Sequence, residues 1–104
     1  MTNPQRGEID AVIGGARRTL CLTLGALAEL EGRLQAGDLN GLAERFTQGR
    51  ISARDLIAIL GAGLRGAGHD LSDEDVSAMT IEGGLKGAAE TAARLLKATF
   101  GEAA

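Results

Sequence analysis

The sequence has few of the residues that build disulfides, metal sites and aromatic cores. Its 104 residues include one cysteine, one histidine, one proline and two phenylalanines, with no tryptophan or tyrosine. The single cysteine, Cys21, excludes an internal disulfide, and His69 as its only soft-ligand companion excludes a structural zinc site. Because aromatic residues make up 2% and hydrophobic residues 44% of the chain, we expect an aliphatic, alanine-rich core.

Charge and hydropathy exclude further classes of partner. Eleven Lys and Arg against fourteen Asp and Glu give a net charge of −3, which offers no general attraction for nucleic acid or anionic lipid. No apolar run approaches the roughly 20 residues of a membrane-spanning helix, and residues 1–7 lack the apolar centre of a signal peptide. We therefore expect a cytoplasmic protein, folded as one domain over residues 1–104, without membrane or small-molecule partners.

Residues 7–23 have the alternating pattern of a β-hairpin. Apolar residues occupy every second position on either side of Gly14-Gly15, and these glycines supply the positive φ angles of a tight turn. The alternating apolar positions are Ile9, Ala11, Ile13, Leu20, Leu22 and Leu24. Two strands alone are marginally stable, so helices have to cover them.

Residues 24–101 change to the three- and four-residue spacing of helices. Candidate N-caps, of which Thr23 is the first, and glycine breaks divide them into four or five short helices, near residues 24–36, 38–48, 52–65, 72–82 and 85–100. Ser52 and Ser72 each stand three residues before an aspartate, the capping-box spacing. The residues expected to be buried in the last helix are Leu85, Ala88 or Ala89, Ala92, Leu95, Leu96 and Phe100. The predicted fold class is α+β, a β-hairpin followed by a compact helical bundle.

Gly61, Gly63 and Gly66 form a G-x-G-x-x-G pattern after an apolar run, which alone is typical of dinucleotide binding. That chemistry needs a strand before the glycines and a helix directly after them, so that helix N–H groups meet a pyrophosphate. Here a capped helix precedes the glycines, and the next helix cannot begin before Ser72. We expect the glycines to permit close helix packing and then end the helix, and we expect no cofactor.

Asp70, Ser72 and Glu74 alternate like the ligands of a calcium loop. However, Asp75 replaces the glycine that such a loop needs, and Ile81 stands where the bidentate glutamate should be. An acidic helix start that matches the helix dipole is the better interpretation.

Cys21 and His69 are the candidates for nucleophilic catalysis. Cys21 falls in a predicted strand, where a small, half-buried residue is the common role, and His69 is expected to serve a loop or helix end. No oxyanion-hole signature accompanies either residue. We expect a protein that is not an enzyme, with no catalytic, cofactor-binding or metal-binding residues.

The segment from Leu42 to Leu64 is the strongest candidate for nucleic-acid binding, since it fits a helix-turn-helix. The arginines available for phosphates are Arg45, Arg50, Arg54 and Arg65. Base recognition needs free side chains near the start of the second helix, but Ser52 and Asp55 are expected to cap it. Ordinary helix packing with solvated arginines is the competing interpretation.

Several segments that occur in one order resemble a known family. They are residues 3–8 (NPQRGE), 20–31 (LCLTLGALAELE), 54–56 (RDL), 62–66 (AGLRG) and 71–76 (LSDEDV). Together they resemble the gene transfer agent tail family of alphaproteobacteria over nearly the whole chain. Members of that family belong to phage-like particles and are described as tail tube proteins and as tail assembly chaperones. The resemblance supplies no catalytic residue.

The predicted elements favour the chaperone role. Tube subunits of long non-contractile tails resemble β-sandwich proteins, whereas this chain has one predicted hairpin. By resemblance, a chaperone would bind the tape-measure protein through an apolar groove and help tail tube subunits polymerise around it. The alternatives are a structural tail (tube) component retained in the particle and a DNA-binding regulator. A homo-oligomer is left open, and no particular residues are predicted to bind the partner.

Overall fold

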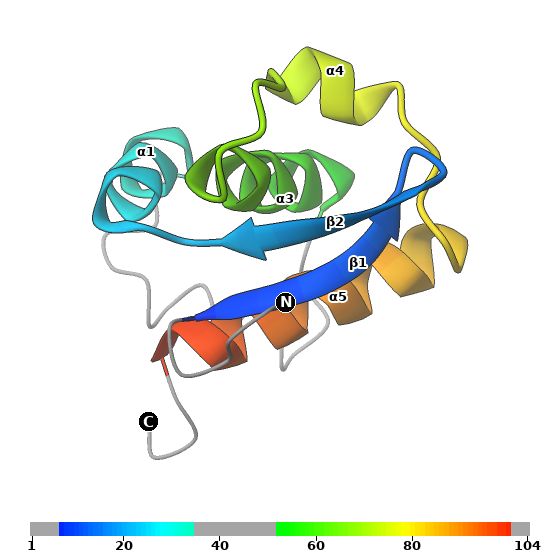
Figure 1. Cartoon of the computed structure of the whole chain (residues 1–104). Helices are drawn as coiled ribbons and strands as arrows, with labels where there is room; N and C mark the ends of the chain where they lie inside the picture. Colours follow the sequence, from blue (N-terminus) through cyan, green and yellow to red (C-terminus); the bar gives the residue numbers. More distant parts are fainter. Residues whose placement is uncertain (1–6, 35–51, 101–104) are drawn as a thin grey trace.

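The computed structural model describes residues 7–34 and 52–100, and Figure 1 shows their arrangement. The elements in chain order are β1 (Glu8–Ile13), β2 (Ala16–Cys21), α1 (Leu24–Leu34), α3 (Ala53–Gly66), α4 (Asp73–Ser77) and α5 (Gly84–Phe100). The predicted α+β fold, a hairpin leading into short helices, is confirmed. The helix predicted near residues 38–48 lies outside the described residues.

The hairpin follows from its two-glycine turn. Gly14 and Gly15 have φ angles of +67° and +80°, as a type I′ turn requires. The strands pair antiparallel from Ile13 opposite Ala16 to Glu8 opposite Cys21. The strand therefore ends before Thr23, whose Oγ1 accepts a hydrogen bond from the Ala26 N–H at 3.1 Å. The prediction of Thr23 as the N-cap of the first helix is confirmed.

The two faces of the hairpin have different surroundings. The buried face carries Ile9, Ala11, Ile13 and Leu20, which belong to the main hydrophobic cluster. Helix α3 packs against β2, and α5 runs along β1 (Figure 1). The opposite face carries Glu8, Asp10, Val12, Arg17, Thr19 and Cys21, which are half-buried or exposed. The core therefore lies between one face of the hairpin and the helices.

Helix α3 is the centre of this core. Ser52 caps it by accepting a hydrogen bond from the Asp55 N–H at 3.1 Å, and most of its turns are buried all round. A Cβ added at Gly63 would lie 2.6 Å from Leu95 Cδ2, and one added at Gly66 would overlap the Cys21 carbonyl oxygen. Both glycines belong to α3, and neighbouring elements approach them more closely than a side chain would allow, so the prediction that they permit close packing is confirmed.

Two leucines of the predicted apolar patterns, Leu24 and Leu85, lie outside the core. Leu24 is 85% exposed and Leu85 is 69% exposed. Leu24 is the first residue of α1 and Leu85 is the second residue of α5, so each lies at the end of its helix, before the turns that pack on the core. Ala26 and Leu30 bury α1 instead.

The rest of α5 follows the predicted stripe. Its buried apolar residues are Ala88, Ala92, Leu95 and Leu96, and Phe100 packs partly buried against the cluster. Lys97 lies in the last turn, where a cation interacts favourably with the helix dipole, as predicted.

Candidate interaction surfaces

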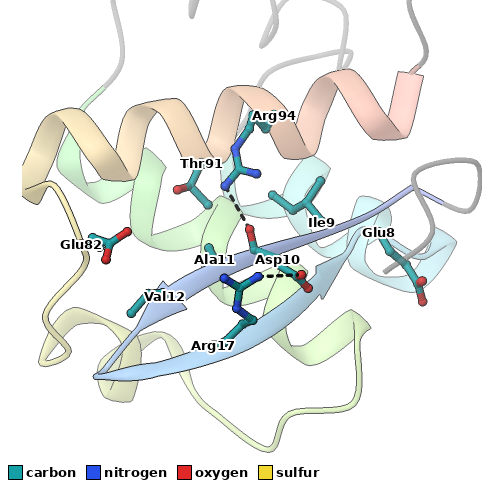
Figure 2. A pocket seen from close by; sticks show the side chains of 9 residues that line it. All are labelled: Glu8, Ile9, Asp10, Ala11, Val12, Arg17, Glu82, Thr91 and Arg94. Carbon is teal, nitrogen blue, oxygen red and sulfur yellow. Dashed lines mark hydrogen bonds and ion pairs between the residues drawn. The ribbon is translucent and has the colours of Figure 1, made fainter. Parts of the chain in front are cut away.

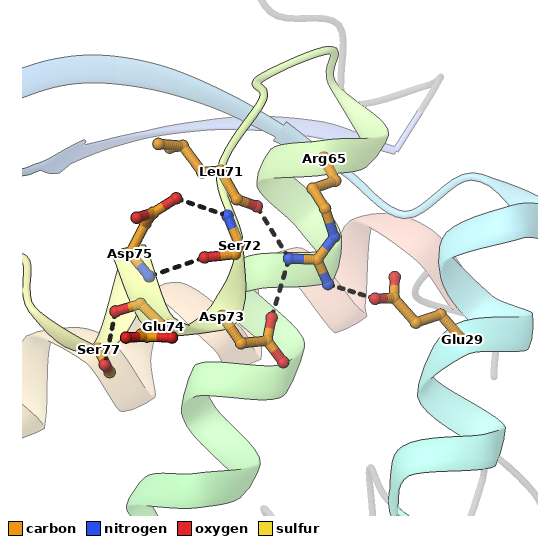
Figure 3. A network of polar contacts seen from close by, with 8 residues as sticks. All are labelled: Glu29, Arg65, Leu71, Ser72, Asp73, Glu74, Asp75 and Ser77. Carbon is orange, nitrogen blue, oxygen red and sulfur yellow. Dashed lines mark hydrogen bonds and ion pairs between the residues drawn. The ribbon is translucent and has the colours of Figure 1, made fainter.

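Arg65, near the end of α3, joins three parts of the fold (Figure 3). Its Nη1 donates to Asp73 Oδ1 at 2.9 Å and to the Leu71 carbonyl oxygen at 3.0 Å, and its Nη2 pairs with Glu29 of α1. Desolvation opposes the charge, but the hydrogen bonds that Arg65 donates to both carboxylates outweigh it and raise the pKa of Arg65. Gly61 leaves room for the Asp73 carboxylate beside α3. This cluster holds α1, α3 and the start of α4 together.

The Arg65 contacts correct part of the helix-turn-helix alternative. That interpretation offered Arg65 to phosphates, but here its guanidinium is held by protein carboxylates and a backbone carbonyl. Arg54 is exposed in the first turn of α3. Arg45 and Arg50 lie outside the described residues. The described part of the proposed motif therefore presents one of its two arginines to solvent.

The acidic start of α4 is a capping box, as predicted. The Asp75 N–H donates to Ser72 Oγ at 3.0 Å, and Asp75 Oδ2 accepts from the Ser72 N–H at 2.9 Å (Figure 3). The hydrogen bond from the Ser72 backbone lowers the pKa of Asp75. Within residues 7–34 and 52–100, no group of three or more His, Cys, Asp or Glu side chains is arranged to hold a metal ion.

Cys21 and His69, the two candidates for nucleophilic chemistry, lie at the end of β2 and just beyond the end of α3. Cys21 is half-buried at the end of β2, and burial, helped by the charge of Glu8, raises the pKa of its thiol. A raised pKa keeps the thiol protonated and weakly nucleophilic. The His69 backbone N–H donates to the Leu64 carbonyl oxygen at 3.0 Å, so the main chain of His69 helps to close the end of α3.

A groove of about 430 Å³ lies beside β1, and we call it the edge groove (Figure 2). Its lining residues come from the hairpin, the segment before α5 and α5 itself; they are Glu8, Ile9, Asp10, Ala11, Val12, Arg17, Glu82, Thr91 and Arg94. Arg94 Nη2 donates to the Asp10 carbonyl oxygen at 3.0 Å, and Arg17 pairs with the Asp10 carboxylate at 3.2 Å. The groove is therefore polar and follows a strand edge.

A second groove, of about 120 Å³, is apolar, and we call it the apolar groove. Helices α3, α4 and α5 and the segment between α4 and α5 form it; the lining residues are Ala53, Leu56, Ile57, Leu60, Val76, Ser77, Met79, Ile81, Leu85 and Ala88. The exposed side chain of Leu85 belongs to this lining, so a partner that bound here would remove it from water.

Sequence reasoning did not find the edge groove. Asp10 and Arg94 are 84 residues apart, and the contact joins an arginine side chain to a backbone oxygen. No spacing rule connects such a pair. The one available signal was the polar face of the predicted hairpin, on which Asp10 and Arg17 both lie.

The described part of the chain has no helix that is both long and apolar enough to cross a membrane. No protein with a curated description and no solved structure is similar enough to be matched to this chain. A family model does match it, over residues 6–102, and that family is described as "Phage tail tube protein, GTA-gp10". The match spans almost the whole chain and agrees with the resemblance carried by the sequence segments. The chain therefore belongs to this gene transfer agent tail family.

Proposed function

We propose that this chain is a structural, non-enzymatic component of a phage-like tail, retained in the particle next to other tail proteins. The observation that carries the proposal is the family match over residues 6–102, because that family is described as a tail tube protein. We further propose that the chain joins the tail in the cytoplasm, where its partners are made.

The surfaces of the fold support a role between neighbours. A subunit in a ring or tube contacts one neighbour through one patch and the next neighbour through a different patch. The edge groove beside β1 and the apolar groove between α3, α4 and α5 are two such patches with different chemistry. One offers a strand edge and charged side chains, and the other offers aliphatic side chains with Leu85 at the surface.

A tail assembly chaperone is the second candidate, and the sequence favoured it. The apolar groove supports this role, because an exposed leucine beside aliphatic side chains suits the apolar stripe of a helical partner such as a tape-measure protein. The small sheet of the described residues also differs from a β-sandwich. The family description favours the tube component, so the chaperone becomes the alternative.

The two candidates differ in where the chain ends up. Immunoblots of purified particles and of assembling cells, with an antibody against the chain, separate them. If the chain is a tail component, it should be present in both samples, in a fixed ratio to other tail proteins. If the chain is a chaperone, it should be present in cells and missing from particles. It should then also co-purify with the long helical protein that is co-expressed with it. Absence from particles would overturn the main proposal.

A further inference from the structure

We infer that the outer edge of β1 at Asp10 is a docking site for an extended segment of another tail protein, which adds to the hairpin as a third strand. The inference rests on the proposed function for the source of the segment. The backbone groups and charges of the edge groove define the site itself.

The hairpin register shows which backbone groups face outward. Across a two-residue turn, Ile13 and Ala16 form a hydrogen-bonded pair, so alternate residues Asp10 and Val12 direct their N–H and C=O groups away from β2. Two contacts agree with this assignment: Val12 O accepts from the Glu82 N–H at 3.3 Å, and Asp10 O accepts from Arg94. The Asp10 backbone therefore faces the edge groove.

The two ends of this edge are covered differently. Near the turn, residues 80–82 lie beside β1, with the Gly14 N–H donating to the Thr80 carbonyl oxygen at 2.7 Å and a bridge between Ile13 and Ile81. At Asp10, the exposed side chain of Arg94 holds the carbonyl oxygen, and no described residue accepts a hydrogen bond from the Asp10 N–H. A backbone partner can satisfy both groups at once, whereas Arg94 satisfies one.

An extended segment is the occupant that fits. A strand beside β1 offers a C=O for the Asp10 N–H and an N–H for the Asp10 C=O, which is the closed pair of an antiparallel ladder. Arg94, which now holds the Asp10 carbonyl oxygen (Figure 2), would have to release it when the segment binds. A helix cannot make these contacts, because its backbone groups are already paired within it.

Charge selects the segment. Three acidic residues, Glu8, Asp10 and Glu82, and two arginines line the groove. Glu8 and Asp10 share the outer face of β1, so a neighbouring strand with Lys or Arg on that face forms favourable cross-strand pairs. A second copy of β1 would instead bring its own Glu8 and Asp10 to this edge. Like charges on adjacent strands are destabilising, so a second copy of β1 is disfavoured and a basic segment of a different tail protein fits this edge better.

The test removes one N–H group. Asp10→Pro deletes the outward N–H and places the proline ring on the edge, while the β1–β2 hydrogen bonds remain. Asp10→Ala is the matched control, since it also loses the carboxylate but keeps the N–H. Circular dichroism and thermal unfolding establish that both variants fold. We expect the amount of chain in purified particles to fall about tenfold for Asp10→Pro relative to Asp10→Ala. Equal amounts of the two variants would overturn the docking site while leaving the proposed function standing.

A second measurement does not depend on the particle. Overlapping synthetic peptides that cover the other tail proteins are added to the ¹⁵N-labelled chain, and amide hydrogen exchange at Asp10 is followed by NMR. We expect at least one basic, extended peptide to slow exchange at Asp10, and Arg94→Ala to strengthen its binding, because the competing side chain is gone. A set of peptides that leaves the Asp10 amide unchanged, or weaker binding by Arg94→Ala, would overturn the inference. If the unmodified chain is missing from particles, the proposed function fails and these peptides alone decide the docking site.

Discussion

Replacing Gly66 with alanine tests the central packing of the fold. Gly66 is the last residue of α3, and a Cβ there would overlap the carbonyl oxygen of Cys21 in β2. The obstacle is backbone, so relief requires α3 and the hairpin to move apart. Overpacking of this kind costs about 1–3 kcal/mol, offset by up to about 1 kcal/mol from the better helix propensity of alanine.

Gly32→Ala is the matched control. Gly32 lies in α1, is exposed, and a Cβ added there meets nothing within 4 Å. The same chemical change should therefore stabilise the protein by about 0.5–1 kcal/mol, through helix propensity and a less flexible unfolded chain. The two variants are predicted to move in opposite directions.

Urea unfolding followed by far-ultraviolet circular dichroism measures both effects. The chain has no tryptophan, so helix content is the suitable signal. In thermal unfolding followed by the same signal, a destabilisation of 1 kcal/mol should lower the melting temperature by about 4 °C for a protein of this size. If Gly66→Ala were as stable as Gly32→Ala, the end of α3 would not lie against β2, and the described packing would be refuted.

Three further predictions concern polar groups. Arg65→Met removes the Arg65 ion pairs with Glu29 and Asp73 and should destabilise the fold by about 1–2 kcal/mol in urea unfolding. Arg54→Met at an exposed position should change the stability by less than about 0.5 kcal/mol, and equal effects of the two substitutions would refute the role of the cluster. Because the pKa of Asp75 is lowered in the fold, the ionised carboxylate stabilises the protein above about pH 4, and this stabilisation is lost as the pH falls through the lowered pKa. Asp75→Asn should therefore flatten the acid side of the profile of unfolding free energy against pH, and an unchanged profile would contradict this. Cys21 should react with iodoacetamide at pH 8 more slowly in the folded chain than in urea, and equal rates would show that burial does not protect the thiol.

The parts of the fold that could be predicted from the sequence are those fixed by near neighbours. The alternation around Gly14-Gly15 encodes the hairpin, because turn and strands lie within one short segment. Ser52 and Ser72 mark helix starts through hydrogen bonds that span three residues. Such contacts depend little on the rest of the chain, so local rules identify them.

The parts that could not be predicted depend on how distant elements meet. Leu85 fits an apolar stripe on α5, but it is the second residue of that helix and its side chain is exposed. Arg65 reaches Glu29 across 36 residues, and Arg94 reaches a backbone oxygen of β1. The candidate docking edge is made of such contacts, so the sequence indicated a binding protein without indicating the surface.

The copy number of the chain in intact particles tests the central claim most directly. Purified, nuclease-treated particles are digested, and the chain is quantified by mass spectrometry against isotope-labelled peptides from it and from the other tail proteins. A structural tail component predicts a fixed, reproducible whole-number ratio to those proteins across preparations. A level that is indistinguishable from contaminating cellular proteins would contradict the account.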